Sequence, residues 1–265
     1  MPEVAGADGI EARGVTVRYG GLVAAENVSL IAPMGRITGL IGPNGAGKST
    51  SFNACSGVVR PSSGTVLLHG QDVTALSPQA RGQKGLGRTF QRMELFRSLT
   101  VRENVGLGVE AGLAGSRPLR HLFSAKRDAV RIRQAVDDAL ARCDLLEVAD
   151  EIAGDLSTGQ GRLVELARVI AGGFSMLLLD EPSSGLDRVE TERFGAILRE
   201  LVADGRRGIL LVEHDMSLVL TVCNYIYVLD FGKLVFEGSP AEVVASPEVQ
   251  LAYLGSSDLE VGTDV

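Results

Sequence analysis

The sequence lacks tryptophan and has only three cysteines among its 265 residues. Cys55, Cys143 and Cys223 stand far apart, and their spacing matches neither a metal-binding nor a redox motif. We therefore expect a reduced, cytoplasmic protein. Its intrinsic fluorescence must come from tyrosine.

Long apolar segments are also missing. The longest candidates, residues 176–179 and 219–229, are short or interrupted by polar groups, whereas a membrane-spanning helix needs about 20 apolar residues. The first eight residues lack the basic start and apolar centre of a signal peptide, so we expect none. The net charge of −7 argues against nucleic acid as the main partner.

The remaining composition is that of a globular protein, with 45% hydrophobic and 22% charged residues. The chain is long enough to bury a full core, as one large domain or as two subdomains.

The most specific pattern is a phosphate-binding loop. An apolar strand is predicted at residues 37–41 and a helix follows to about Cys55, which is the context that the motif G-x-x-x-x-G-K-[ST] requires. Its glycines let backbone N–H groups turn toward phosphate oxygens, and the helix dipole adds to this. Lys48 can reach the β- and γ-phosphates, and the Ser49 hydroxyl suits Mg²⁺. The loop consists of Gly42, Pro43, Asn44, Gly45, Ala46, Gly47, Lys48, Ser49 and Thr50.

Two adjacent carboxylates end a later apolar strand. Asp180 suits a carboxylate that serves Mg²⁺, and Glu181 can hold or deprotonate an attacking water. The alternative is a pair of acidic residues that open a turn before Pro182. The presence of Lys48 and Ser49 favours the first interpretation.

Two further polar residues stand at positions that suit the same chemistry. His214 follows the apolar strand 209–212 and can hydrogen-bond a γ-phosphate and the attacking water. Gln91 stands where the α/β pattern ends, and its amide can contact Mg²⁺ or water. Taken singly, His214 fits an ordinary surface histidine better, and Gln91 is an ordinary polar residue.

A second helix start is preceded by Leu156-Ser157-Thr158-Gly159-Gln160. Ser157 is a candidate N-cap, and Gly159 allows close backbone approach, so this helix N-terminus can bind an anion. A chain with one phosphate loop does not need a second such site for its own nucleotide. We therefore expect it to complete the site of another copy placed head to tail, the alternative being an ordinary capped helix.

The apolar pattern also divides the chain. Short antiparallel strands are expected over residues 57–72, a capping box at 100–103 opens a helix, and helical spacing predicts an amphipathic helix over about 124–143. The basic start of that helix fits either a solvated face or a face turned to anionic lipid. The expected division is an α/β core of residues 10–91 and 159–238 with an antiparallel β part, a helical insert of residues 92–158, and a helical tail of residues 239–265.

Taken in order, these motifs resemble those of the ATP-binding subunits of ABC transporters, and the resemblance covers about residues 10–255. It identifies residues 42–50 as Walker A, Gln91 as the Q-loop, residues 156–160 as the signature, residues 176–181 as Walker B with the catalytic glutamate, residues 184–187 as the D-loop and His214 as the H-loop.

The resemblance implies a P-loop NTPase (RecA-like) α/β core with a small antiparallel β subdomain and an inserted α-helical subdomain. It also implies ATP hydrolysis with Mg²⁺. Catalytic roles would then fall to Glu181, His214 and Gln91, and metal contacts to Ser49, Gln91 and Asp180. Nucleotide contacts beyond the loop would come from Tyr19, Ser157, Gly159, Gln160 and Asp187. Tyr19 stands where the family places an aromatic that stacks on adenine, and a strand-end core tyrosine is the alternative.

One position departs from the family pattern, because Thr158 replaces the first glycine of Leu-Ser-Gly-Gly-Gln. Its backbone N–H remains, but threonine would be strained if the position required a positive φ. Residues 87–91, 95–104, 212–216 and 252–255 look like the branched-chain amino-acid uptake group. The lipopolysaccharide-export ATPases share several of these features.

The resemblance implies a transport motor: a homodimer or heterodimer of ATPase subunits with transmembrane permease subunits and an extracytoplasmic substrate-binding protein, peripheral on the cytoplasmic side of the membrane. Alternatives are a lipopolysaccharide-type exporter, a soluble ABC ATPase acting on DNA or ribosomes, and a non-enzymatic nucleotide sensor. The sequence does not identify the transported substrate.

Overall fold

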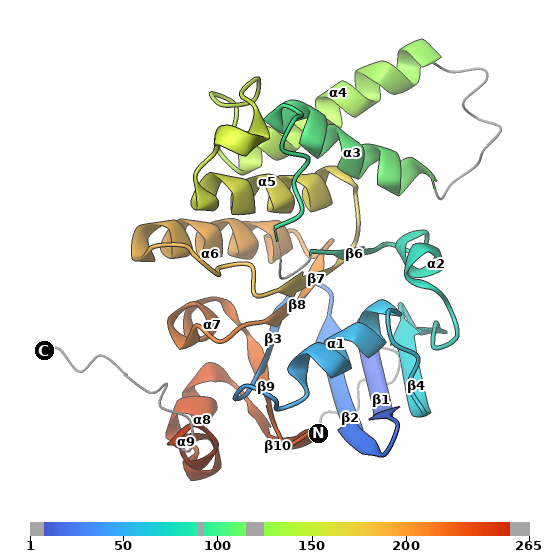
Figure 1. The fold of residues 1–265 in the computed structure, drawn as a ribbon, viewed down its shortest axis with the longest axis vertical. Coiled ribbons are helices and arrows are strands. Elements are labelled where there is room, and N and C mark those ends of the chain that lie inside the picture. The colour runs from blue at the N-terminus through green and yellow to red at the C-terminus, as the bar shows by residue number, and fades with distance from the viewer. Residues whose placement is uncertain (1–7, 90–92, 115–124, 255–265) are drawn as a thin grey trace, which may run out of the picture.

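The computed structural model describes residues 8–89, 93–114 and 125–254. These residues form two β-sheets and a set of helices, with a helical group on one side of the larger sheet and the smaller sheet on the other (Figure 1).

The larger sheet has six strands in the order β10-β9-β3-β8-β7-β6. Its pairings from β9 to β6 are parallel, and β10 pairs antiparallel with β9. Every residue of β3, β7 and β8 is buried, as expected for central parallel strands covered on both faces. The strands are β3 (Ile37–Ile41), β6 (Leu86–Arg88), β7 (Met176–Asp180), β8 (Gly208–Val212), β9 (Tyr225–Asp230) and β10 (Lys233–Gly238).

The smaller sheet is antiparallel and has the order β2-β1-β4-β5, so the expectation of antiparallel strands within residues 57–72 is confirmed. Helix α1 (Lys48–Ser56) packs between the two sheets, and its Phe52 belongs to a core cluster that draws residues from both. The strands are β1 (Gly9–Tyr19), β2 (Leu22–Pro33), β4 (Ser63–Leu68) and β5 (Gln71–Asp72).

A buried arginine closes the C-terminal end of α1. The Arg81 guanidinium is fully buried and donates to the carbonyl oxygens of Ala54 and Cys55 at 2.7 and 2.6 Å. These carbonyls lie in the last turn of the helix, where a cation is favourable. Arg81 lies on α2 (Pro78–Gly82), a helix too short for the sequence pattern to reveal.

Helices α3 (Val101–Ala114), α4 (Ala125–Arg142) and α5 (Thr158–Ala171) pack against one another. The predicted helix over 124–143 is confirmed as α4. The predicted capping box is confirmed at the start of α3, where Glu103 N donates to Thr100 Oγ1 and Thr100 N donates to Glu103 Oε2. Because α5 packs with α3 and α4, the helical group continues past the expected boundary at residue 158.

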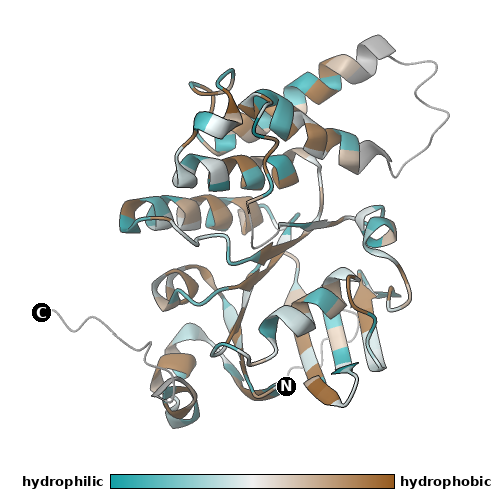
Figure 2. Cartoon of the chain, viewed as in Figure 1, coloured by the Kyte–Doolittle hydropathy of each residue, from teal (hydrophilic) through white to brown (hydrophobic). Residues whose placement is uncertain are grey.

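The remaining helices are α6 (Arg188–Ala203), α7 (Met216–Val222), α8 (Pro240–Ala245) and α9 (Pro247–Leu254). Figure 2 shows hydrophobic residues concentrated in the strands of the larger sheet, whereas the helices mix hydrophobic and hydrophilic residues. Across the described ranges, no helix has the length and hydropathy needed to cross a membrane.

We predict that the three cysteines are unreactive in the folded chain. All three are buried, and burial raises the pKa of each thiol to about 12. The reactive thiolate is therefore nearly absent at pH 8. A colorimetric thiol assay with a disulfide reagent should detect three thiols in urea and none without it, and rapid release of one equivalent from the folded protein would contradict this.

Candidate functional site

The phosphate loop connects β3 to α1 and has the backbone geometry that its glycines allow. Gly42 and Gly47 have φ values of 147° and 93°. A Cβ on Gly42 would lie 2.1 Å from a carbonyl oxygen of β9, and a Cβ on Gly47 would lie 2.5 Å from a carbonyl oxygen of β2. Gly47 is the N-cap residue of α1 and supplies no side-chain hydrogen bond. The first turn of α1 is therefore not capped by its own N-cap side chain, which suits a bound anion.

Lys48 folds back over this loop. Its Nζ donates to the carbonyl oxygens of Gly42 at 2.5 Å and Pro43 at 3.1 Å, and the residue is 6% exposed. Burial lowers the pKa of Lys48, while the carboxylates of Glu181 and Asp180 oppose that shift. A phosphate group bound here can therefore contact both the Lys48 ammonium group and a metal held by the nearby carboxylates.

A cavity of about 520 Å³ lies over the loop. It brings together loop residues from Asn44 to Thr50 with Glu181, and its remaining wall comes from β2 and the turn after β9. That wall includes Leu22 and Phe231, which are 67% and 88% exposed. Neither residue was predicted to line a site from the sequence, in which Phe231-Gly232 indicates only a turn.

Tyr19 lies near this wall without lining the cavity. It ends β1, pairs with Leu22 across the hairpin, and is 49% exposed. The alternative of a buried core tyrosine is therefore wrong, and stacking on adenine stays a prediction.

The predicted catalytic residues Glu181 and His214 lie together. Strands β7 and β8 are adjacent and parallel, with Asp180 paired to Val212, and Glu181 N donates to the Val212 carbonyl oxygen at 2.8 Å. This pairing places His214 Nδ1 3.9 Å from Glu181 Oε2, which is too long for a hydrogen bond. Glu181 has a φ of 46°, and such left-handed geometry at a non-glycine residue costs about 1–3 kcal/mol and clusters at functional sites.

Glu213 connects the turns after β7 and β8. It is fully buried, and its Oε1 accepts hydrogen bonds from Ser183 N at 2.9 Å and Ser183 Oγ at 2.7 Å. Its Oε2 accepts from His214 N at 3.1 Å. Burial raises the pKa of Glu213, while the hydrogen bonds from Ser183 oppose that shift. The connecting role of Glu213 was not predicted from the sequence, where it is simply the first polar residue after the apolar strand 209–212.

The residues present fit Mg²⁺. Asp180 is 5% exposed, and burial raises the pKa of its carboxyl group while Arg88 lowers it. The described residues contain no group of three or more His, Cys, Asp or Glu side chains that could hold a metal by themselves. Mg²⁺ is usually held by one or two carboxylates together with substrate phosphates. Asp180 and Ser49 match that pattern, whereas Gln91 lies outside the described residues.

The second predicted anion site lies elsewhere in the chain. Ser157 caps α5, with its Oγ accepting from Gln160 N at 3.1 Å and its N–H donating to Gln160 Oε1 at 3.0 Å. Ser157 lines a small cavity that shares no residue with the one over the phosphate loop. A Cβ on Gly159 would lie 2.0 Å from Glu190 Oε1, so a larger residue there would have to displace the Glu190 carboxylate, which accepts from Asp187 N at 3.0 Å.

Asp187 is also separate from the phosphate loop. It caps α6, where its side chain accepts from Glu190 N at 2.8 Å, and it lines a third cavity between α6 and α7. Thr158 is the first residue of α5 and is not among the described non-glycine residues with a positive φ. The strain considered for Thr158 is therefore not present.

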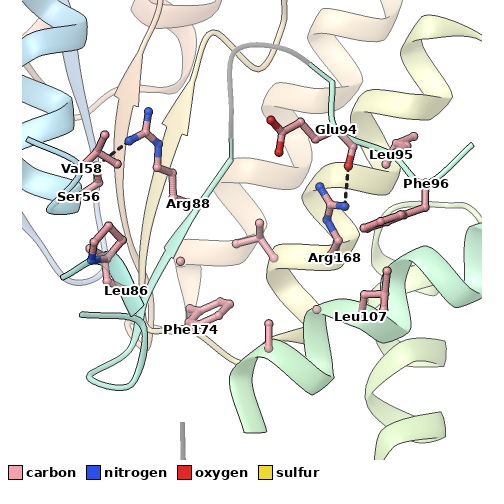
Figure 3. A pocket seen from close by; sticks show the side chains of 15 residues that line it. Ser56, Val58, Leu86, Arg88, Glu94, Leu95, Phe96, Leu107, Arg168 and Phe174 are labelled. Atoms are coloured by element: carbon pink, nitrogen blue, oxygen red, sulfur yellow. Dashed lines mark hydrogen bonds between the residues drawn. The ribbon is translucent and has the colours of Figure 1, made fainter. Parts of the chain in front are cut away.

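A groove of about 640 Å³ lies between β6 and helices α3 and α5. Figure 3 shows Phe96, Arg168 and Phe174 around it, with Arg168 donating to the Glu94 carbonyl oxygen at 2.7 Å. Glu94 N in turn donates to the buried Glu165 at 2.9 Å. The segment that follows residue 92 is thus fixed to α5 and forms one wall of the groove.

We predict that Glu213→Gln lowers the free energy of unfolding by about 1–3 kcal/mol. The amide has one acceptor oxygen, so its NH₂ group must face either the Ser183 donors or the His214 N–H. Urea unfolding followed by far-UV circular dichroism measures the change. The control is Glu192→Gln, whose side chain is 66% exposed, and an equal effect of the two substitutions would contradict the prediction.

Comparison with known proteins matches this geometry to one family. The family model described as ABC transporter matches residues 25–184, and a model described as branched-chain amino acid ATP-binding cassette transporter matches residues 233–258.

Two relatives match almost the whole chain. The high-affinity branched-chain amino acid transport ATP-binding protein LivG of Escherichia coli K12 is 37% identical over 255 residues, which cover 94% of this chain and 98% of LivG. The lipopolysaccharide export system ATP-binding protein LptB of Acidithiobacillus ferridurans is 33% identical over 246 residues, covering 93% of this chain and 96% of LptB.

A solved structure shares the fold. The ADP conformation of MJ1267, an ATP-binding cassette of an ABC transporter, superposes with a TM-score of 0.81 at 30% identity, covering 93% of this chain and 98% of MJ1267. Because the ABC transporter model spans more than half of the chain and LivG matches nearly all of it, the chain belongs to the ABC transporter family of ATP-binding cassettes.

Proposed function

We propose that this chain is the ATP-hydrolysing subunit of an ABC importer for branched-chain or other hydrophobic amino acids. The observation that carries the proposal is a phosphate loop, Asp180, Glu181 and His214 gathered at one sheet edge, in a chain that matches LivG along nearly its full length.

In this proposal, ATP binds over residues 42–50. Backbone N–H groups and the dipole of α1 hold the phosphates, and the exposed Leu22 and Phe231 with Tyr19 offer apolar surface to the base. Lys48 leaves the carbonyl oxygens of Gly42 and Pro43 and turns to the β- and γ-phosphates.

Hydrolysis follows from the position of Glu181 and His214. A water oxygen attacks the γ-phosphorus, the bond to the β–γ bridging oxygen breaks, and Glu181 accepts a proton from the water. His214, 3.9 Å from Glu181, donates to the γ-phosphate. Mg²⁺, when bound, neutralises the charge that develops on the phosphates. Ser49, Asp180 and Gln91 are the residues proposed to hold it.

The second part of the site comes from another subunit. Ser157, Gly159, Gln160 and Asp187 lie away from the phosphate loop of their own chain. They reach a nucleotide only if two subunits face each other head to tail. We therefore place each ATP between the phosphate loop of one subunit and the α5 N-terminus of the other, in a homodimer or a heterodimer.

The groove beside α3 and α5 is the proposed docking site for a transmembrane permease subunit. It is wide, carries the exposed Phe96, and adjoins the segment after Gln91. We propose that residues 92–158, together with α5, move as a unit relative to the α/β core and carry the effect of ATP to the permease. The chain would then be peripheral on the cytoplasmic side of the membrane, with an extracytoplasmic binding protein supplying substrate.

A lipopolysaccharide-type exporter is the second candidate, because LptB is also similar over nearly the whole chain. The match of residues 233–258 to the branched-chain amino acid model favours the importer. Polypeptides that co-purify from mildly solubilised membranes distinguish the two. Co-purification with ribosomes or nucleic acid instead of membranes would favour a soluble ABC ATPase.

We expect Lys48→Ala to reduce phosphate release from ATP by about 100-fold or more, because the buried cation stabilises charge on the transferred phosphoryl group. A phosphate assay on the purified chain measures this. Lys84→Ala, which removes a lysine bonded to Gln71, is the matched control. Equal rates for wild type and Lys48→Ala would rule out this site as the source of activity.

We expect Glu181→Gln to form a stable dimer in ATP and Mg²⁺, because ATP binds between two subunits and is not hydrolysed. Size-exclusion chromatography with light scattering should give twice the chain mass with ATP and the monomer mass without it. Glu192→Gln, on the exposed face of α6, should remain a monomer in both. A monomeric Glu181→Gln variant in ATP and Mg²⁺ would refute the two-subunit site.

A further inference from the structure

Arg88 stands between the nucleotide site and the groove beside α3 and α5. It is the last residue of β6 and pairs with Leu178 on β7, two residues before Asp180. Alternate side chains of a strand share a face, so Arg88 and Asp180 lie on the same face of the sheet. Arg88 also lines the groove beside α3 and α5, where Figure 3 shows its guanidinium next to Ser56.

The guanidinium contacts both strand β7 and helix α1. Arg88 Nη2 lies 3.3 Å from Asp180 Oδ2, and Nη1 donates to Ser56 Oγ at 2.6 Å. Its Cζ lies 4.7 Å from the centre of the Phe52 ring, a cation–π contact. The side chains of Arg88 and Asp180 are only 15% and 7% exposed. Arg88 is therefore fixed by α1 in a position that directs one nitrogen at the proposed metal carboxylate.

A buried ion pair of this kind is weak evidence for a stabilising role. Removing both charges from water costs about as much as their attraction returns, and well-packed apolar residues are often as stable. Burial lowers the pKa of Arg88 and raises that of Asp180, which shows the desolvation cost at each partner. At 3.3 Å the contact is also longer than the roughly 2.7–2.9 Å of strong charge-assisted hydrogen bonds, so a competing cation can displace it.

We propose that Arg88 is a positioning residue that holds the Asp180 carboxylate and competes with Mg²⁺ for it, so that Arg88 sets the metal affinity of the nucleotide site. Asp180 N donates to Thr89 Oγ1 at 3.2 Å, which keeps the backbone in place while the side chain changes partner. The adjoining groove leaves room for the guanidinium when Mg²⁺ takes the carboxylate. This inference rests on the proposed function, because it assumes that the site binds Mg²⁺ with a nucleotide.

The test measures metal binding without hydrolysis. The dissociation constant of the fluorescent analogue mant-ADP is determined in Mg²⁺ and in EDTA. The constant in EDTA divided by the constant in Mg²⁺ reports how strongly Mg²⁺ supports binding, and we call this quotient the mant-ADP ratio. Direct titration of Mn²⁺ into the protein–ADP complex, followed by electron paramagnetic resonance, gives a second measure of metal affinity.

We expect Arg88→Gln to increase the mant-ADP ratio and the Mn²⁺ affinity by about three- to tenfold, because Mg²⁺ no longer displaces a charged hydrogen-bond partner. Arg88→Lys, which keeps the charge on a shorter group, should lie between Arg88→Gln and wild type. Ser56→Ala removes the anchor at 2.6 Å and keeps the arginine, so it should raise metal affinity more weakly. It also decides the question if Arg88→Gln fails to fold.

The control is Arg102→Gln on α3, which removes the same charge from a residue paired with Asp137 and Asp150. It should leave the ratio unchanged. An unchanged or reduced metal affinity in Arg88→Gln and Ser56→Ala, with mant-ADP binding retained, would overturn the inference about Arg88 alone. Failure of the wild-type chain to bind mant-ADP would overturn the proposed function and this inference with it.

Discussion

The candidate site depends on the parallel pairing of β3, β8 and β7. Because these strands run in one direction, their carboxyl ends meet at a single edge of the sheet. β3 leads into the phosphate loop, β7 into Asp180 and Glu181, and β8 into Glu213 and His214. Every residue of the three strands is buried, so a slip by one residue would reverse which face each side chain meets. The hydrophobic core thus fixes chemical groups that are distant in sequence.

Buried charged side chains connect the functional segments of the chain. Glu213 joins the turns after β7 and β8, Glu165 holds the chain after residue 92 against α5, and Arg88 joins Asp180 to α1. Each of these groups loses hydration, and hydrogen bonds from neighbouring turns compensate the loss. Apolar residues could fill the same space, but they would not fix one turn relative to another. The polar network therefore gives the strand ends a defined geometry that packing alone leaves open.

The two proposed parts of the nucleotide site do not meet within one subunit. The phosphate loop lies at one edge of the larger sheet, whereas Ser157 begins a helix in the group formed by α3, α4 and α5. The groove beside β6 is lined by residues of the α/β core and by residues of α3 and α5. A change in the spacing of the two groups would alter the groove and the position of Ser157 together. This arrangement is the physical basis of the proposed link between a nucleotide-dependent dimer and a membrane partner.

The sequence by itself determined the local features. It predicted the phosphate loop, the caps at Ser157 and Thr100, the helix α4 and the antiparallel strands, because each depends on the spacing and the type of nearby residues. It missed β6 and α2, which are too short to show periodicity. Only the tertiary structure decided that Glu181 adopts a left-handed φ beside His214, that Phe231 lines the cavity, and that Arg88 reaches Asp180. These contacts join segments that are far apart in the chain. Strand order and register bring the segments together, and no local sequence pattern encodes either of them.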